Sequence, residues 1–202
     1  MESAEISTKR ADAATNRARI IEVGQTVFAE CGLEMEINEV AARAHLGVGT
    51  LYRHFGNRED LLRAIVQRAT EDALTRMSAA LASTPDDPRA SLQTLVLHSL
   101  QVQQQYKPLF AVIRDPRLKK ILDPSYGQAI RARFRAMIGD MIRHGIEIGV
   151  FRDDLDPEMA AVTILGSFAC AHDLLGTHYS LEELAQKLSH HLLTMFTEKA
   201  EE

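Results

Sequence analysis

Cysteine is nearly absent from this 202-residue chain, which has two, at positions 31 and 170. Two cysteines so far apart make neither a disulfide framework nor a metal motif, because both need several ligands at short spacings. We expect Cys31 and Cys170, each on an apolar helical face, to be buried thiols in a reducing cytosol. No nucleophile triad, phosphate loop or metal spacing appears either, so we predict no enzyme activity, no cofactor and no metal site.

Long apolar runs are missing too. No stretch of about 18 apolar residues and no signal-peptide pattern occurs, so we expect a cytoplasmic protein with no membrane span. A basic excess is also lacking, since the formal net charge is −5. Bulk composition therefore does not indicate a nucleic-acid-binding protein, and only a local basic surface could support one.

Strand patterns are absent as well, because apolar and polar residues do not alternate and Gly and Pro stand at presumed helix ends. Apolar residues recur instead at helical spacing, which predicts an all-α fold. Residues 1–14, rich in Ala, Ser, Thr and charge, predict a flexible arm. The helices that we expect span residues 16–31, 37–44, 49–55, 57–82, 88–107, 157–175 and 181–197. Between residues 107 and 157 we expect a broken helical region followed by a long helix around 130–148.

The segment from His45 to Phe55 is the most informative part of the chain. Its apolar residues recur at i, i+3, i+4 and i+7 and predict a short helix with one buried face: Val48, Leu51, Tyr52 and Phe55. The opposite face carries small residues and donors suited to phosphates and base edges: Gly49, Thr50, Arg53 and His54. A helix, a tight turn and such a short helix together predict a helix-turn-helix, whose second helix enters the DNA major groove.

A wider segment, residues 19–64, resembles the DNA-binding domain of the tetracycline-repressor (TetR) family of bacterial regulators. The matching pieces are Arg19-Ile20-Ile21, Phe28-Ala29-Glu30 with Gly32, Glu39-Val40-Ala41, Gly49 to Phe55, and Asn57 to Leu61. The resemblance implies about nine helices in two domains. A three-helix DNA-binding domain would span residues 15–60, and a helical ligand-binding and dimerisation domain residues 61–202.

Three positions depart from the family pattern. His45 stands in the turn where glycine is usual, so it must adopt a left-handed backbone or shift the turn. Asn38 is the nearest candidate for the Ser or Thr that usually caps the helix before the turn and touches a phosphate. Arg58 replaces the usual lysine at the start of the next helix, which keeps a phosphate-binding charge there.

We expect a set of polar and small residues to contact DNA. In the family pattern Thr50, Tyr52, His54 and Arg58 would hold phosphates, whereas Arg53, Gly49 and His45 are freer to touch base edges. The full predicted set is Arg17, Asn38, His45, Gly49, Thr50, Tyr52, Arg53, His54 and Arg58.

The two C-terminal helices predict a homodimer. Residues 157–175 are apolar nearly all round, and residues 181–197 show near-heptad spacing, so a chain of this size has little room to cover both within one subunit. The resemblance implies a four-helix interface at the same place. The predicted interface residues are Leu165, Gly166, Ala169, Leu184, Leu188, Leu192 and Met195.

The resemblance also implies a small-molecule cavity in the middle of the chain, although ordinary core packing explains the same residues. The candidate lining residues are Leu95, His98, Val102, Phe110, Phe134, Met137, Met141 and His144. We therefore expect a DNA-binding regulator that binds a palindromic operator as a homodimer and is released by an unknown small-molecule effector. The resemblance implies that it is a repressor. The alternative is a metal- or ligand-binding helical protein without operator binding.

Overall fold

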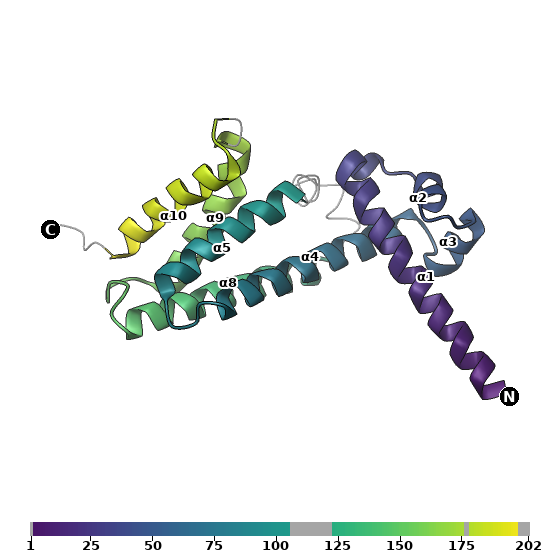
Figure 1. Ribbon diagram of the computed structural model, residues 1–202, viewed down its shortest axis with the longest axis horizontal. Helices are drawn as coiled ribbons and strands as arrows, with labels where there is room; N and C mark the ends of the chain where they lie inside the picture. The colour runs from purple at the N-terminus through teal and green to yellow at the C-terminus, as the bar shows by residue number, and fades with distance from the viewer. Residues whose placement is uncertain (1, 106–122, 176–177, 198–202) are drawn as a thin grey trace. The chain divides into compact units, whose positions relative to one another are not determined.

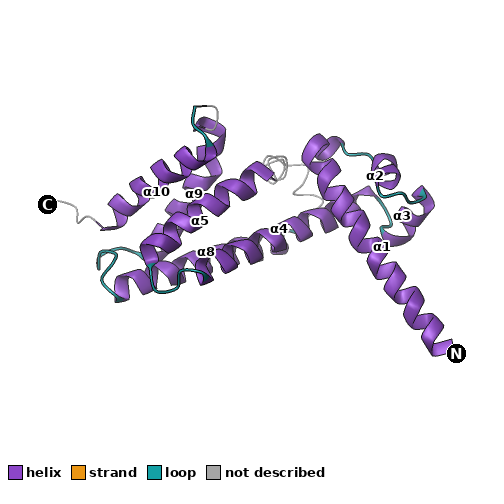
Figure 2. Cartoon of the chain, viewed as in Figure 1, coloured by secondary structure: helices purple, strands orange, loops and turns teal. Residues whose placement is uncertain are grey.

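The computed structural model describes residues 2–105, 123–175 and 178–197, with side chains over 13–105, 123–168, 170–171 and 178–197. Every regular element in these ranges is helical, which confirms the all-α prediction (Figure 2). Eight α-helices and one 3₁₀ turn are present there, close to the nine helices expected. Their bounds are α1 Glu2–Cys31, η1 Gly32–Glu34, α2 Ile37–Arg43, α3 Val48–His54, α4 Arg58–Ala82, α5 Pro88–Gln105, α8 Pro124–Glu147, α9 Pro157–Leu175 and α10 Leu181–Thr197 (Figure 1). None of these helices is both long and apolar enough to cross a membrane.

The first helix is longer than predicted. It begins at Glu2 and not near Asn16, so the segment expected to be a flexible arm is helical. Residues 2–23 contain no glycine or proline and many Ala, Glu, Lys and Arg residues, which have high helix propensity. The side chains from Ala13 to Arg19 are exposed or half-buried. The segment has few large apolar residues, so it lacks packing partners, but its helix propensity is high enough for a helix to form.

The N-terminal compact unit contains α1, η1, α2, α3 and α4 as far as Glu71. Gly24 of α1 lies against Ile65 of α4, where a Cβ atom would come 2.6 Å from Ile65 Cδ1. The first turns of α4 therefore pack against α1, and this unit extends beyond the boundary expected at residue 60. Its core is formed by Ile20, Val27, Phe28, Met35, Val40, Leu51, Leu61, Leu62 and Ile65.

The second compact unit contains the rest of α4 with α5, α8, α9 and α10. α5 packs against α8, α9 and α10, and α8 packs against α9 (Figure 1). α9 and α10 have the bounds that the sequence predicted. Ser180 and Glu183 explain why α10 begins there: the Glu183 amide donates to Ser180 Oγ and the Ser180 amide donates to the Glu183 carboxylate, a capping box. The bond from the Ser180 amide lowers the pKa of the Glu183 carboxyl.

Both cysteines are exposed, so the prediction of buried thiols was wrong. Cys31 is the last residue of α1, and Cys170 lies on α9 between buried Phe168 and Ala171. On a helix, the positions between buried residues turn outward, and apolar neighbours in sequence do not alter that geometry.

Candidate nucleic-acid interface

The turn between α2 and α3 is built around His45, which has a φ of 51°. The Leu46 amide donates to Ala41 O at 3.0 Å, and the His45 amide donates to Ala42 O at 3.1 Å. These two bonds make a Schellman motif, in which the residue at the position of His45 is usually glycine. Of the two outcomes predicted for His45, the structure therefore has the left-handed backbone, and the turn is not shifted.

α3 is a two-turn helix anchored by few residues. Leu51 and Phe55 are buried, whereas Val48 is partly exposed and the Tyr52 side chain is 51% exposed. The prediction that all four form one buried face was therefore wrong for Val48 and Tyr52. A helix this short contacts the core only through the positions that point directly at it, which leaves its flanking apolar residues on the surface.

The exposed side of α3 brings several predicted DNA contacts together. Gly49, Tyr52 and Arg53 are exposed, and a Cβ atom at Gly49 would meet nothing within 4 Å. The guanidinium of Arg53 donates to Thr50 Oγ1 at 3.1 Å, one turn back along the helix. His54 is half-buried. This surface offers hydroxyl, guanidinium and open backbone groups on one helix, which suits contact with phosphates and base edges.

Arg17 joins this surface from α1. Its guanidinium lies over the ring of Phe55, 5.0 Å from the ring centroid, and the residue is exposed. A cation on α1 is thereby held beside the C-terminal end of α3.

α2 contributes less than the sequence suggested. The residue that caps α2 is Glu36, with no side-chain capping bond, so Asn38 is not the cap and lies exposed within the first turn. Arg43 is paired with Glu30 of α1 at 2.7 Å and with Glu39 at 2.6 Å. Its hydrogen bond lowers the pKa of the Glu30 carboxyl, and the bonds to both carboxylates raise the pKa of Arg43. The positive charge of Arg43 is therefore compensated, and the local basic surface is smaller than a count of residues implies.

The start of α4 differs most from its predicted role. Asn57 caps the helix, since its Oδ1 accepts from the Asp60 amide at 2.8 Å. Arg58 turns inward: its Nε donates to Met35 O at 2.9 Å and its Nη2 donates to Leu33 O. The guanidinium is thus bound to the protein's own backbone, whereas the sequence predicted that it binds a phosphate. The sequence could not predict these two hydrogen bonds, because every residue has a backbone carbonyl and residue type does not show which carbonyl an arginine will meet.

The predicted ligand-pocket residues divide by burial. Leu95 and Met141 are buried in the core of the second unit, and Phe134 and Met137 pack against that core. Val102 of α5 is also buried. His98 and His144 are half-buried, and Phe110 is outside the described residues. For the buried residues of this set, the burial supports the interpretation that they are ordinary core residues.

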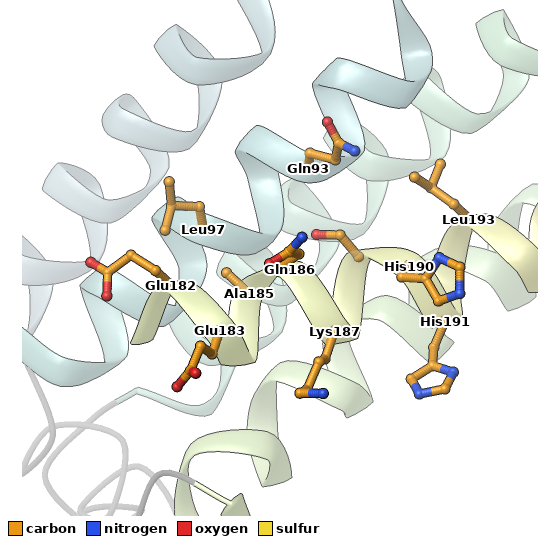
Figure 3. A pocket seen from close by; sticks show the side chains of 11 residues that line it. Gln93, Leu97, Glu182, Glu183, Ala185, Gln186, Lys187, His190, His191 and Leu193 are labelled. Atoms are coloured by element: carbon orange, nitrogen blue, oxygen red, sulfur yellow. The ribbon is translucent and has the colours of Figure 1, made fainter. Parts of the chain in front are cut away.

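A pocket of about 840 Å³ lies elsewhere, on the α5 and α10 side of the second unit. Gln93 and Leu97 come from α5 and the other lining residues from α10 (Figure 3). Its lining includes Glu182, Lys187 and His190 and none of the eight predicted residues. Among the residues with described side chains, no group of three or more His, Cys, Asp or Glu residues could hold a metal ion.

The predicted dimer residues also divide. Leu184 and Leu192, which were predicted as interface residues, are buried in the core of one subunit. Met195 and Gly166 are exposed, and Leu165 and Leu188 are half-buried. The side chain of Ala169 lies outside the described side chains. Two apolar residues of α9 outside the predicted set are exposed: Met159, 61% exposed, and Val162, 49% exposed. Because α9 is apolar nearly all round, its sequence could not indicate which side the neighbouring helices leave open.

Comparisons with known proteins agree with this geometry. Residues 20–65 match the family of bacterial regulatory proteins, tetR family. The HTH-type transcriptional repressor KstR2 of Rhodococcus jostii (strain RHA1) is 26% identical over 147 residues, which are 71% of this chain and 72% of the relative.

Two solved structures share the fold. The ketosteroid transcriptional regulator KstR2 of Mycobacterium tuberculosis superposes with a TM-score of 0.70 at 23% identity, over 91% of this chain and 95% of that one. The transcriptional regulator FadR from Bacillus subtilis, in complex with stearoyl-CoA, gives a TM-score of 0.67 at 18% identity, over 88% and 97% of the two chains.

Proposed function

Because this chain belongs to the TetR family of bacterial regulatory proteins, we propose that it is a repressor that binds a palindromic operator as a homodimer and leaves it when a small molecule binds. The chain is a helix-turn-helix transcriptional regulator and not an enzyme. The observation that carries the proposal is the open side of α3, where exposed Tyr52, Arg53 and Gly49 lie on a helix anchored by buried Leu51.

Each residue of α3 has a distinct part in this proposal. Arg53 reads a base edge, for which a guanidinium fork is suited, and it exchanges its bond to Thr50 for one to DNA. The Thr50 and Tyr52 hydroxyls hold phosphates and set the register. Gly49 has no side chain, which allows the helix backbone to approach the groove closely.

The homodimer rests on apolar residues that one subunit leaves exposed. Met159 and Val162 lie on α9, Met195 lies on α10, and Gly166 permits close helix approach. A palindromic operator presents its two half-sites about one duplex turn, roughly 34 Å, apart, and an isologous two-fold dimer presents one copy of α3 to each half-site.

The effector is proposed to bind in the second unit, and the protein to act in the cytoplasm, where operator DNA lies. FadR was solved with stearoyl-CoA and KstR2 is named a ketosteroid regulator, so acyl-CoA thioesters and ketosteroids are the first probes. Half-buried His98 and His144 are the polar candidates for such a ligand. Release of operator DNA on adding stearoyl-CoA or a ketosteroid is the measurement.

The proposal is tested by selecting duplexes from a random library with the wild-type protein and measuring their affinity by fluorescence anisotropy. Arg53→Ala should relax the base preference at one position of each half-site, where a good contact is worth about 1–3 kcal/mol. Arg89→Ala, an exposed arginine of α5 in the second unit, is the matched control and should bind like wild type. Failure of the wild-type protein to enrich any sequence would overturn the proposed function, and normal base preference in Arg53→Ala would overturn the role of Arg53.

A further inference from the structure

We propose that Arg58 is a positioning residue for DNA binding, which holds the connector between α1 and α2 and does not bind phosphate. The inference rests on the proposed function, since it assigns how the DNA-binding unit keeps its shape. Arg58 is the first residue of α4, and its guanidinium donates to the carbonyl oxygens of Leu33 and Met35. This one side chain therefore joins the start of α4 to two backbone carbonyls that lie 23 and 25 residues earlier in the sequence.

The two carbonyls lie where the backbone has left one helix and not begun the next. Leu33 is within η1, and Met35 is the residue that ends η1. Carbonyls in such a connector are not all bound by the backbone amides of a helix, so they need other hydrogen-bond donors. A guanidinium supplies two N–H donors in a planar fork. Met35 itself is buried, so its side chain and its carbonyl are both held in place.

The direction of α2 depends on this connector. Glu36 follows Met35 directly and caps α2 without any side-chain capping bond. α2 then leads through the Schellman turn at His45 to α3, with only Ala44 to Gly47 between the two helices. A shift of the connector therefore moves α2 and α3 together relative to α1 and the first turns of α4.

A second contact holds the same end of α4. Ile65 fits against Gly24 of α1, two turns beyond Arg58. The apolar contact sets the distance between α1 and α4, and the Arg58 fork sets where the connector lies along α4. A lysine would keep the charge but present its donors at one point, without the fork that matches two separated carbonyls.

The test measures the affinity of Arg58→Lys and Arg58→Ala for a wild-type-selected duplex and for a scrambled duplex, across a range of salt concentrations. We expect both variants to bind the selected duplex about tenfold more weakly, to bind the scrambled duplex like wild type, and to keep the wild-type salt slope. A phosphate contact predicts the opposite: Arg58→Ala would lower the salt slope by about one and weaken both duplexes, while Arg58→Lys would bind normally.

Arg63→Ala is the matched control, because Arg63 lies on the same helix, pairs with Asp60 at 2.6 Å, and its loss removes one equal charge. It should leave the ratio of selected to scrambled affinity unchanged. Circular dichroism confirms that each variant is folded at the assay temperature, and Arg58→Gln, with one amide donor, replaces Arg58→Ala if that variant does not fold. A loss of stability alone would not change the affinity ratio of a fully folded protein.

Amide hydrogen exchange of residues 32–36 gives an independent readout and should be faster in Arg58→Lys than in Arg63→Ala. Normal selected-duplex affinity in Arg58→Lys, or a lowered salt slope in Arg58→Ala, would overturn this inference while leaving the proposed function intact. A wild-type protein that selects no duplex would instead overturn the proposed function.

Discussion

The guanidinium of Arg17 lies 5.0 Å from the centroid of the Phe55 ring and joins α1 to the residue that ends α3. α3 has only two turns and few buried side chains, so a contact at its end contributes to its orientation. Phe55 is a buried core residue, and one face of its ring also contacts a cation at the surface. The pair couples a residue predicted to contact DNA to the packing of the helix that would read it.

This relationship predicts a measurable coupling between the two residues. In a double-mutant cycle with Arg17→Ala and Phe55→Leu, the interaction energy from urea unfolding should be about 0.5–1 kcal/mol, as for an exposed cation–π pair. The same cycle with Arg19→Ala, an exposed arginine two residues along α1, is the control and should give no coupling. Additive effects for Arg17 and Phe55 would show that the contact contributes nothing.

The left-handed backbone at His45 predicts that His45→Gly stabilises the protein. Relief of the backbone strain exceeds the entropy that glycine adds to the unfolded chain, so the free energy of unfolding should rise by about 0.5–1 kcal/mol. His45→Val, with a β-branched side chain in the same conformation, should lower it by about 1–2 kcal/mol. Urea unfolding of the three proteins checks the order, and a less stable His45→Gly would contradict it.

Two buried serines of α5 predict opposite responses to alanine. Ser91 Oγ donates to Thr84 O at 2.6 Å, whereas Ser99 Oγ has no hydrogen-bond partner among the described residues. Ser99→Ala removes an unpaired buried hydroxyl and should raise the free energy of unfolding by about 1 kcal/mol, while Ser91→Ala should lower it by a similar amount. Equal losses in both variants would mean that Ser99 makes a stabilising contact.

The exposed side of α9 predicts which substitution separates the proposed dimer. Val162→Glu would place an unpaired carboxylate in the interface and should raise the dimer dissociation constant at least about a hundredfold. Ile148→Glu, at an equally exposed apolar residue after α8, should leave the dimer intact. Sedimentation velocity at micromolar concentration distinguishes these outcomes, and a dimeric Val162→Glu would place the interface elsewhere.

Local patterns in the sequence were sufficient for most helix bounds. The Asn57 cap of α4, the Ser180–Glu183 capping box of α10 and the unusual residue in the turn at His45 all depend on contacts within a few residues. The same holds for the family segment, whose helix-turn-helix spacing is set by the backbone.

Contacts between distant residues decided the rest, and periodicity could not predict them. Arg58 meets carbonyls of the α1–α2 connector, Arg43 is paired with Glu30, and Leu184 and Leu192 enter the core that includes α5. A helical pattern predicts whether a residue lies on the apolar or the polar side of its helix. It does not predict which other element covers that side.

The sequence by itself thus determined the helices, the turn and the family, because those features depend on short-range geometry and residue type. The tertiary structure alone decided which arginines are bound within the protein and which apolar residues remain exposed on α9. The physical reason is that a side chain forms hydrogen bonds with, or is buried by, the residues that folding brings near it. In these cases those residues are far away in sequence.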